Sequence, residues 1–435
     1  LLQTSYNPTI KTRDSFDRKT NTSCIERICN MNYVETAKRA KKGSFLLSSI
    51  SEGIRNSALS LICEKLRENQ DYIFAANQKD LQAAEENALP SPLLSRLKFD
   101  SKKLSTCIDG MHDLIGMDDP LNRVLMKRQL DQGLMLTKVT CPIGVIGVIF
   151  ESRPDALLQI SGLCIKSGNC AILKGGSEAS HTNRALFDVV HQAGVEAGLP
   201  DGFLSLVDTR EGVEELLSCH EYIDLIIPRG SNAFVQHIME NSKIPVMGHA
   251  VGICHIYVAE DADIPMALKI IEDSKLQYPA ACNAVETLLL HQDIYDKIIS
   301  SITDKITLKE GEYNQEYLDT VMTVKKVSSI DEAIDSINSN GSHHTDCIIT
   351  KDRKNADHFM DRVDSAGVYH NCSTRFADGF RYGFGAEVGI STGKLHARGP
   401  VGLDGLVTYK YKLYGSGQTV EPYATGEKKF HFEDL

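Results

Sequence analysis

The chain has 435 residues, enough for two or three domains, and 42% of them are hydrophobic, which is typical of a globular protein. Its 58 acidic side chains outnumber 47 Lys and Arg, so the formal net charge is −11. No dense basic stripe occurs, which argues against nucleic acid and anionic membranes as main partners. The longest apolar runs are far shorter than the ~20 residues of a membrane helix.

The twelve cysteines are scattered along the chain, without the close spacing of a small disulfide-stapled domain. They also lack the paired Cys and His spacings of a structural zinc site. His343 and His344 would point to opposite faces of a strand, so they would not share an ion. We therefore predict reduced thiols, no metal and a cytoplasmic location.

The N-terminal third is predicted to begin with an extension and continue with helices. Residues 1–32 are rich in Thr, Ser, Asn and charge and lack apolar periodicity, which predicts a disordered segment. Apolar residues at helical spacing then continue to about residue 97. Its first apolar face is formed by Ile54, Ala58, Leu61, Ile62 and Leu66.

Short β-rich runs alternate with helical runs between residues 142 and 258, and this alternation predicts a parallel, doubly wound sheet. The predicted strands are 145–150, 170–173, 204–207, 223–227 and 255–258. The predicted crossover helices are 155–167, 178–197, 211–218 and 232–240. Gly168 and Gly198 stand where glycines end helices.

A second alternating block predicts a second α/β domain. Its elements are a helix at 264–276, a strand at 285–291, a helix at 330–338 and a strand at 346–350. A last strand, 406–414, is expected to pair with 134–140 as an oligomer contact. The predicted divisions are a cofactor domain at 33–262, interrupted near 128–141, a catalytic domain at 263–395, and a return segment with the last strand at 396–435.

The segment 278–287, between a predicted helix and a predicted strand, contains a candidate nucleophile. Pro279 stops the helix, and Ala280 and Ala281 leave room for an open loop that carries Cys282. Such loops often carry nucleophiles. The alternative is that Cys282 is one more small buried thiol.

The segment 150–155 joins a predicted strand to a predicted helix, at the sheet edge where doubly wound folds bind ligands. Ser152 and the helix N-terminus could donate hydrogen bonds to an oxyanion or a phosphate. Arg153 could form a bidentate pair with either group. A surface ion pair between Arg153 and a neighbouring acid is the alternative.

Two further strand ends carry glycine turns and a cation, which suits a nucleotide ribose or phosphate. The G-x-G-x-x-G fingerprint is absent, and two glycines after a strand are also typical of a plain tight turn. The expected cofactor contacts are Lys174, Gly175, Gly176, Ser177, Arg229, Gly230 and Ser231.

Three polar segments, 340–346, 371–376 and 383–392, are candidates for substrate contacts. We expect His344 and Thr345 to lie in a substrate-binding loop, with a hydrogen-bonded turn as the alternative. Asn283, beside the candidate nucleophile, is also expected to contact the substrate. Arg375 could bind a substrate carboxylate. A purely structural loop is the alternative for Arg375 and for the glycine-rich segment.

Together, the segments 150–155, 173–177, 278–287 and 383–396 closely resemble the γ-glutamyl phosphate reductase family, within the aldehyde dehydrogenase superfamily. The pattern from Val327 to Ile348 also resembles that family's signature. Ser336 and Asn340 depart from it, where the family pattern has His and His or Tyr. The resemblance extends from about residue 33 to about residue 415.

The resemblance implies an α/β fold of the aldehyde dehydrogenase type, with a Rossmann-like cofactor domain, an α/β catalytic domain and a small β oligomerisation element. It implies that Cys282 is the nucleophile and Ser152 lies at the oxyanion site. It also implies NADPH as the cofactor, with Glu316 at the nicotinamide ribose and Lys174 at the 2′-phosphate or ribose.

The activity implied is reduction of L-glutamyl 5-phosphate to L-glutamate 5-semialdehyde through a thioester on Cys282, the second step of proline biosynthesis. Residues 245–248 occupy the region where oxidising relatives carry a water-activating glutamate, and that glutamate is missing. An activated acyl phosphate needs no such water. A homo-oligomer and a glutamate 5-kinase partner are further expectations. The alternatives are an aldehyde-oxidising relative and a non-catalytic partner of the kinase.

Overall fold

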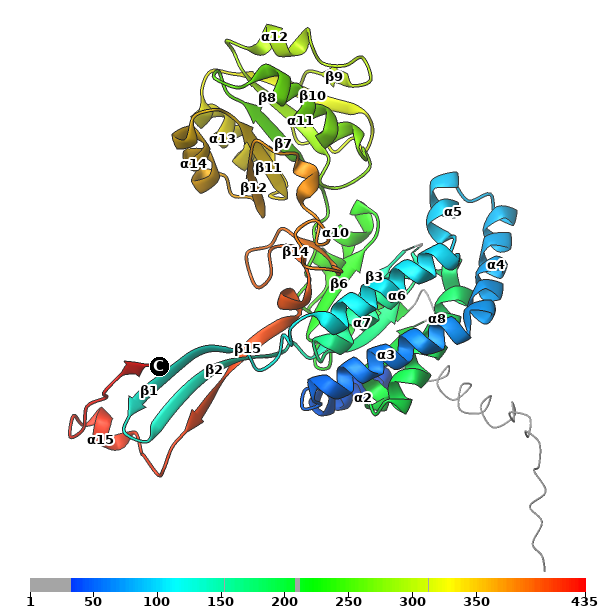
Figure 1. The fold of residues 1–435 in the computed structure, drawn as a ribbon, viewed down its shortest axis with the longest axis vertical. Coiled ribbons are helices and arrows are strands. Elements are labelled where there is room, and N and C mark those ends of the chain that lie inside the picture. Colours follow the sequence, from blue (N-terminus) through cyan, green and yellow to red (C-terminus); the bar gives the residue numbers. More distant parts are fainter. Residues whose placement is uncertain (1–32, 152, 208–211, 312) are drawn as a thin grey trace, which may run out of the picture.

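The computed structural model describes residues 33–151, 153–207, 212–311 and 313–435, so the predicted extension at 1–32 lies outside the described residues. The chain forms two α/β lobes and a long antiparallel arm (Figure 1). We call these the first lobe, the second lobe and the arm. No helix in the described ranges is long and apolar enough to cross a membrane.

The first lobe is built on a parallel sheet with the strand order β5-β4-β3-β6. Its strands are β3 (Val145–Phe150), β4 (Cys170–Lys174), β5 (Leu204–Val207) and β6 (Leu225–Arg229). All residues of β3 and β4 are buried, as expected of strands covered on both faces. The doubly wound sheet predicted for this part of the chain is confirmed, except that the predicted strand 255–258 belongs to the sheet of the second lobe.

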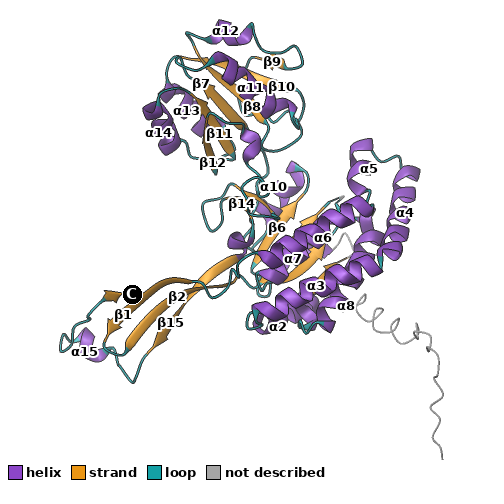
Figure 2. Cartoon of the chain, viewed as in Figure 1, coloured by secondary structure: helices purple, strands orange, loops and turns teal. Residues whose placement is uncertain are grey.

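Helices cover this sheet, and further helices of the first lobe lie to one side of it (Figure 2). They are α2 (Tyr33–Leu47), α3 (Glu52–Glu68), α4 (Gln70–Glu86), α5 (Ser91–Leu97), α6 (Ser101–Gly116), α7 (Pro154–Lys166), α8 (Ser180–Glu196), α9 (Gly212–Ser218) and α10 (Asn232–Asn241). Gly168 and Gly198 follow α7 and α8 with φ of +70° and +95°, which confirms their predicted positions at helix ends.

The second lobe is built on a parallel six-stranded sheet with the order β12-β11-β7-β8-β10-β9. Its strands are β7 (Cys254–Val258), β8 (Val285–His291), β9 (Thr307–Lys309), β10 (Val321–Val327), β11 (Thr345–Ile349) and β12 (Gly367–His370). Its helices are α11 (Ile264–Leu276), α12 (Tyr295–Ile299), α13 (Ile330–Asn340) and α14 (Arg353–Arg362). Alternate strand residues enter two separate apolar clusters, one with Ile256 and Leu288, the other with Tyr257 and Leu289.

The predicted domain boundary at 262/263 is wrong. β7 pairs with β8 and β11, so the second lobe begins before Cys254. The error has a physical reason. A buried parallel strand is a continuous apolar run in either lobe, and the composition of the chain does not change where the second lobe begins.

The arm is an antiparallel sheet with the order β15-β2-β1-β16. Its strands are β1 (Val124–Asp131), β2 (Leu134–Pro142), β15 (Val407–Tyr414) and β16 (Glu433–Asp434). The predicted pairing of the last strand with 134–140 is confirmed, in a register that runs from Val407 opposite Pro142 to Tyr414 opposite Met135. The remaining elements are β13 (Gly389–Ser391), β14 (Gly399–Val401), α15 (Glu421–Ala424) and short 3₁₀ turns at Ser177–Ala179, Asp201–Phe203, Thr374–Phe376 and Leu403–Leu406.

Candidate active site

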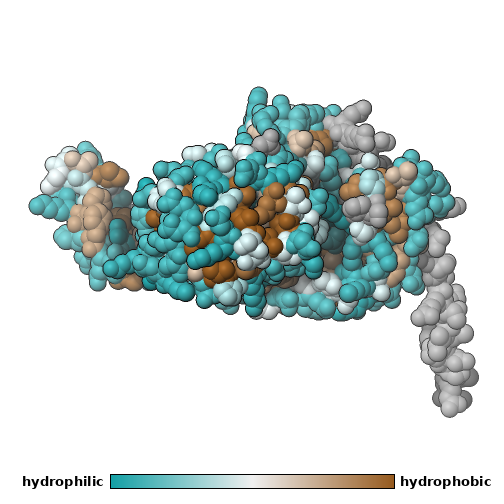
Figure 3. All heavy atoms as spheres, turned by 90° about the horizontal axis from the view of Figure 1, so that it is seen from above, coloured by the Kyte–Doolittle hydropathy of each residue, from teal (hydrophilic) through white to brown (hydrophobic). Residues whose placement is uncertain are grey.

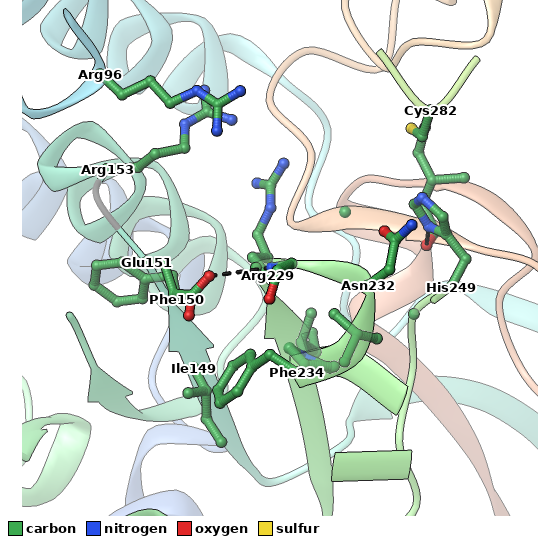
Figure 4. A pocket seen from close by; sticks show the side chains of 18 of the residues that line it. Arg96, Ile149, Phe150, Glu151, Arg153, Arg229, Asn232, Phe234, His249 and Cys282 are labelled. Atoms are coloured by element: carbon green, nitrogen blue, oxygen red, sulfur yellow. Dashed lines mark hydrogen bonds between the residues drawn. The ribbon is translucent and has the colours of Figure 1, made fainter. Parts of the chain in front are cut away.

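A cleft of about 1660 Å³ is lined by residues of both lobes. Its floor is made by the carboxyl ends of β3, β4 and β6, the edge at which open α/β sheets bind ligands. Across from this edge lie the loop 278–283 and the segment 375–390. This volume is large enough for a dinucleotide and a small substrate together. We call it the interlobe cleft (Figure 4).

Cys282 lies in this cleft, on the turn between α11 and β8, and is half-buried. It is the only cysteine among the described residues that lines the cleft. Burial raises the pKa of the thiols of Cys63 and Cys107 to about 11 and about 12, and it raises the pKa of Cys254 well above its ordinary value. Raised thiol pKa values disfavour the reactive thiolate, so these cysteines are structural.

The loop that carries Cys282 is held by its neighbours. The buried side chain of Asn283 donates from Nδ2 to the carbonyl of Ala377 at 2.8 Å, and Thr374 Oγ1 donates to the carbonyl of Asn283 at 2.7 Å. Cys254 Sγ contacts the carbonyl oxygen of Cys282 at 3.4 Å. Asn283 was expected to bind substrate. It does line the cleft, but its amide nitrogen is engaged in fixing the loop.

Gly252 packs against the backbone of Cys282, the candidate nucleophile, and sequence reasoning missed it. A Cβ at this position would lie 2.6 Å from Cys282 Cα and 2.2 Å from its carbonyl oxygen. Only glycine allows the two backbones to approach this closely. The available signal was an isolated glycine just before a strand, which often marks a close backbone approach.

Four arginines line the cleft: Arg96, Arg153, Arg229 and Arg375. In Figure 4 the Arg229 side chain points into the cavity, with Arg153 on one side and Cys282 on the other. Burial, followed by repulsion from Arg153, lowers the pKa of Arg229 from its ordinary value. Arg375 is 8% exposed, and its Nε donates to Gln277 Oε1 at 2.9 Å. Both guanidiniums interact electrostatically with Cys282, so an anion bound there meets fixed positive charge.

The residues predicted to contact the cofactor lie at neighbouring strand ends. Lys174 ends β4 and Arg229 ends β6, on either side of β3. The turn after β6 is fixed by Glu151, whose Oε2 accepts from the backbone N–H of Ser231 at 3.1 Å. A Cβ at Gly230 would come within 2.7 Å of that same oxygen. The turn after β6 is thus held by the Glu151 carboxylate at the sheet edge where open α/β folds bind ligands.

Glu316 also lines the cleft, held by contacts with two segments. Its Oε1 accepts from the backbone N–H of Gly252 at 3.1 Å, and its Oε2 accepts from Asn232 Nδ2. The carboxylate therefore joins α10 of the first lobe to the glycine that packs against the candidate nucleophile. This position suits a group that accepts hydrogen bonds from ribose hydroxyls.

Not every predicted residue reaches the cleft. Thr345 is buried on β11 and does not line the cleft. His344 is fully buried and does not line the cleft either. Ser152 falls outside the described residues. Ser336 and Asn340, the two departures from the family pattern, lie on α13, which contributes no residue to the cleft lining.

His249 is a second residue that sequence reasoning missed. It lines the cleft, and a ring nitrogen of His249, a ring nitrogen of His344 and the Sγ of Cys282 all lie within 4.8 Å of one another. The two imidazole rings meet edge to face, with centroids 4.9 Å apart. His249 stands alone in its segment, without a neighbouring acid or motif that would have indicated it.

The model of the aldehyde dehydrogenase family matches residues 30–319 and 311–389. A γ-glutamyl phosphate reductase of Pelotomaculum thermopropionicum is 53% identical over 420 residues, which cover 92% of this chain and 97% of that protein. The chain belongs to the γ-glutamyl phosphate reductases of the aldehyde dehydrogenase family. Membership of the aldehyde dehydrogenase family implies a nicotinamide cofactor.

Solved structures of γ-glutamyl phosphate reductases agree with this assignment. The enzyme of Thermotoga maritima is 34% identical, with a TM-score of 0.87, and the match covers 89% of this chain and 100% of that one. The enzyme of Saccharomyces cerevisiae is 38% identical, with a TM-score of 0.52, and the match covers 89% of this chain and 98% of that one. The predicted family and the predicted fold of the aldehyde dehydrogenase type are both confirmed.

Proposed function

We propose that this chain reduces L-glutamyl 5-phosphate to L-glutamate 5-semialdehyde with NADPH, through a thioester on Cys282. The observation that carries the proposal is that one thiol shares one cleft with arginines and with the strand ends proposed to bind a dinucleotide. In Figure 4 the Arg229 side chain lies in the cavity between Arg153 and Cys282. An acyl phosphate and a hydride donor can therefore meet at the same sulfur atom.

In the first step, Cys282 Sγ attacks the acyl carbon and the phosphate group leaves. Arg153 is proposed to bind the phosphate oxygens, because a guanidinium matches a phosphate with two parallel hydrogen bonds. The buried Arg375 is the candidate for the substrate carboxylate, since its guanidinium is fixed by Gln277 at one edge of the cleft. These cations stabilise the charge that develops on the leaving group.

The thioester must then survive until reduction. No carboxylate occurs at 245–248, so the chain offers no base there that would activate a hydrolytic water. The oxyanion formed on the acyl oxygen needs hydrogen-bond donors. The sequence assigns this role to Ser152 and to backbone N–H groups near Cys282.

When bound, NADPH supplies the hydride that reduces the acyl group. Lys174 and the turn 175–177 are the residues proposed to bind its 2′-phosphate or ribose, and the turn 229–231 its phosphates. Glu316 is proposed to accept from the nicotinamide ribose hydroxyls, and its bond to Gly252 would keep that ribose beside the nucleophile.

The test uses the reverse reaction: purified enzyme with glutamate 5-semialdehyde, NADP⁺ and phosphate, followed by NADPH absorbance. We expect NADPH formation that requires phosphate, is slower with NAD⁺, and falls to background in Cys282→Ala. A matched control is Cys372→Ala, which removes another half-buried thiol that does not line the cleft. Activity retained in Cys282→Ala, or turnover equally fast without phosphate, contradicts the proposal.

We also propose that the arm carries a contact between copies of this chain. Tyr409, Tyr411 and Leu413 alternate along one face of β15 and are 50%, 58% and 56% exposed. Apolar surface is visible on the arm at the left of Figure 3. β15 is an edge strand, and an exposed apolar edge is a template for association.

A further inference from the structure

The proposed reaction leaves one proton without a carrier. When Cys282 attacks as a thiol, its proton must leave the sulfur atom. When phosphate departs from a dianionic acyl phosphate, one of its oxygens must gain a proton to give hydrogen phosphate. The sulfur atom loses one proton and the phosphate gains one, so a single group between them could transfer that proton.

We propose that His249 carries this proton, taking it from Cys282 Sγ and delivering it to the departing phosphate oxygen. The inference rests on the proposed acylation of Cys282. Its geometric basis is that His249 lines the interlobe cleft within 4.8 Å of the thiol. This separation is closed by one water molecule or by a small rotation of the thiol when substrate binds.

The tautomer of His249 is fixed by the backbone. Its Nδ1 lies 2.8 Å from the carbonyl oxygen of Ile390, and a carbonyl can only accept, so Nδ1 carries the hydrogen. In the neutral ring Nε2 is therefore the unprotonated nitrogen and is available as the base. This is the arrangement that a proton carrier needs, with one nitrogen held and the other free to exchange.

The surroundings keep this ring neutral. Burial is the main cause that lowers the pKa of His249, and the Arg229 guanidinium adds to it. The hydrogen bond to Ile390 and the carboxylates of Glu316 and Glu387 act in the opposite direction, and the pKa remains below its ordinary value. A neutral imidazole accepts the thiol proton, and its conjugate acid gives the proton up readily to a phosphate oxygen.

His344 is placed to position His249 rather than to carry the proton. It is fully buried, it does not line the cleft, and its ring meets that of His249 edge to face. Its Nδ1 is 2.9 Å from Thr345 Oγ1, and within the described residues its Nε2 has no hydrogen-bond partner. Between the two histidines, only His249 can reach both the sulfur and a substrate.

The test compares wild type with His249→Asn, whose amide can still donate to the Ile390 carbonyl in place of Nδ1. The reverse reaction is started at about pH 9, where hydroxide in the buffer can take the thiol proton in place of a protein base. We expect His249→Asn to form NADPH in its first turnover, close to one equivalent per subunit. Its later, phosphate-dependent turnover should be slower by about 10²–10⁴-fold, the usual contribution of a general base.

The matched control is His343→Asn, one residue from His344. The His343 ring contacts the carbonyl of Asp364 through Nδ1 at 2.6 Å and lies outside the cleft lining. Its φ of +59° is one that Asn tolerates, so the same substitution should leave turnover within about twofold of wild type.

The pH dependence gives a second readout that a purely structural role would not alter. In wild type, phosphate-dependent turnover should fall as the pH drops below the pKa of His249, which burial holds under that of an ordinary histidine. In His249→Asn this acid limb should be absent. Phosphate's own titration cancels in the ratio of wild-type to variant turnover, so that ratio should fall as the pH drops. Wild-type turnover in His249→Asn, or equal loss of first and later turnovers, overturns the proposal. Failure of the wild type itself would instead refute the proposed function.

Discussion

Cys282 is held in place by backbone contacts from a segment far from it in the sequence. Gly252 lies against its Cα and its carbonyl, and the N–H of Gly252 in turn donates to Glu316. The nucleophile and the residue proposed to hold the cofactor ribose are thus connected through a single glycine. A change at this glycine should therefore affect catalysis more than folding.

We predict that Gly252→Ala lowers stability by about 1–3 kcal/mol, because the added Cβ overpacks the contact with Cys282. The loop must shift to make room, and a displacement of about 1 Å costs roughly 10²-fold in rate. Chemical denaturation and the reverse assay measure the two effects. Gly110→Ala on α6 is the control, since a Cβ there meets no atom within 4 Å. A Gly252→Ala enzyme with normal activity would contradict the close-contact argument.

At the scale of residues, the sequence predicts the charged part of the site better than the rest. Lys174 and Arg229 lie between a predicted strand and a glycine, Arg375 lies in a polar segment after a strand, and all three line the cleft. His249 could not be predicted in this way, because its proposed role depends on its nearness to Cys282, which only the tertiary fold creates. Thr345 looked equally suitable in the sequence but is buried within the sheet.

Between elements, a buried ion pair joins the helix before Cys282 to the strand after it. Lys275 Nζ on α11 lies 2.8 Å from Glu286 Oε2 on β8, and both side chains are fully buried. Burial raises the pKa of Glu286 to about 7 and lowers that of Lys275, because both charges have lost most of their hydration. The backbone N–H of Tyr317, next to Glu316, also donates to this carboxylate.

We predict that Glu286→Leu destabilises the protein by about 3–5 kcal/mol, since it leaves the ammonium of Lys275 buried and unpaired. The double substitution Lys275→Met with Glu286→Leu should cost less than the single one, because no isolated charge remains. Urea denaturation of the two variants at pH 7 measures the difference. A double variant less stable than Glu286→Leu alone would show that the pair itself stabilises the fold.

At the scale of elements, the strands with long apolar runs were predictable: β3 and β8 have the predicted bounds. β10 was not predicted, because Lys325 and Lys326 interrupt its alternation. In the structure these two ammonium groups lie near aromatic rings, Lys326 Nζ at 4.3 Å from the centroid of Tyr295 and Lys325 Nζ at 5.2 Å from that of Tyr313. Such contacts let lysines occupy a strand, and local sequence does not reveal them.

For the whole molecule, we predict that Tyr411→Lys shifts the protein towards a smaller assembly. The substitution places a charge in the middle of the apolar face of β15, where a partner copy is proposed to pack. Light scattering coupled to gel filtration measures the mass. Thr408→Lys, at an exposed position on the opposite face of the same strand, is the control and should leave the mass unchanged. Equal masses for Tyr411→Lys and wild type would exclude this face as the contact.

The arm also sets an order of events during synthesis. β1 and β2 leave the ribosome before either lobe is complete, whereas β15, which covers the open edge of β2, is made only after both lobes. Domains fold as units while the chain is being made. The surface proposed to join subunits is therefore completed last, and neighbouring nascent chains on one messenger RNA cannot pair through it before their catalytic lobes have formed.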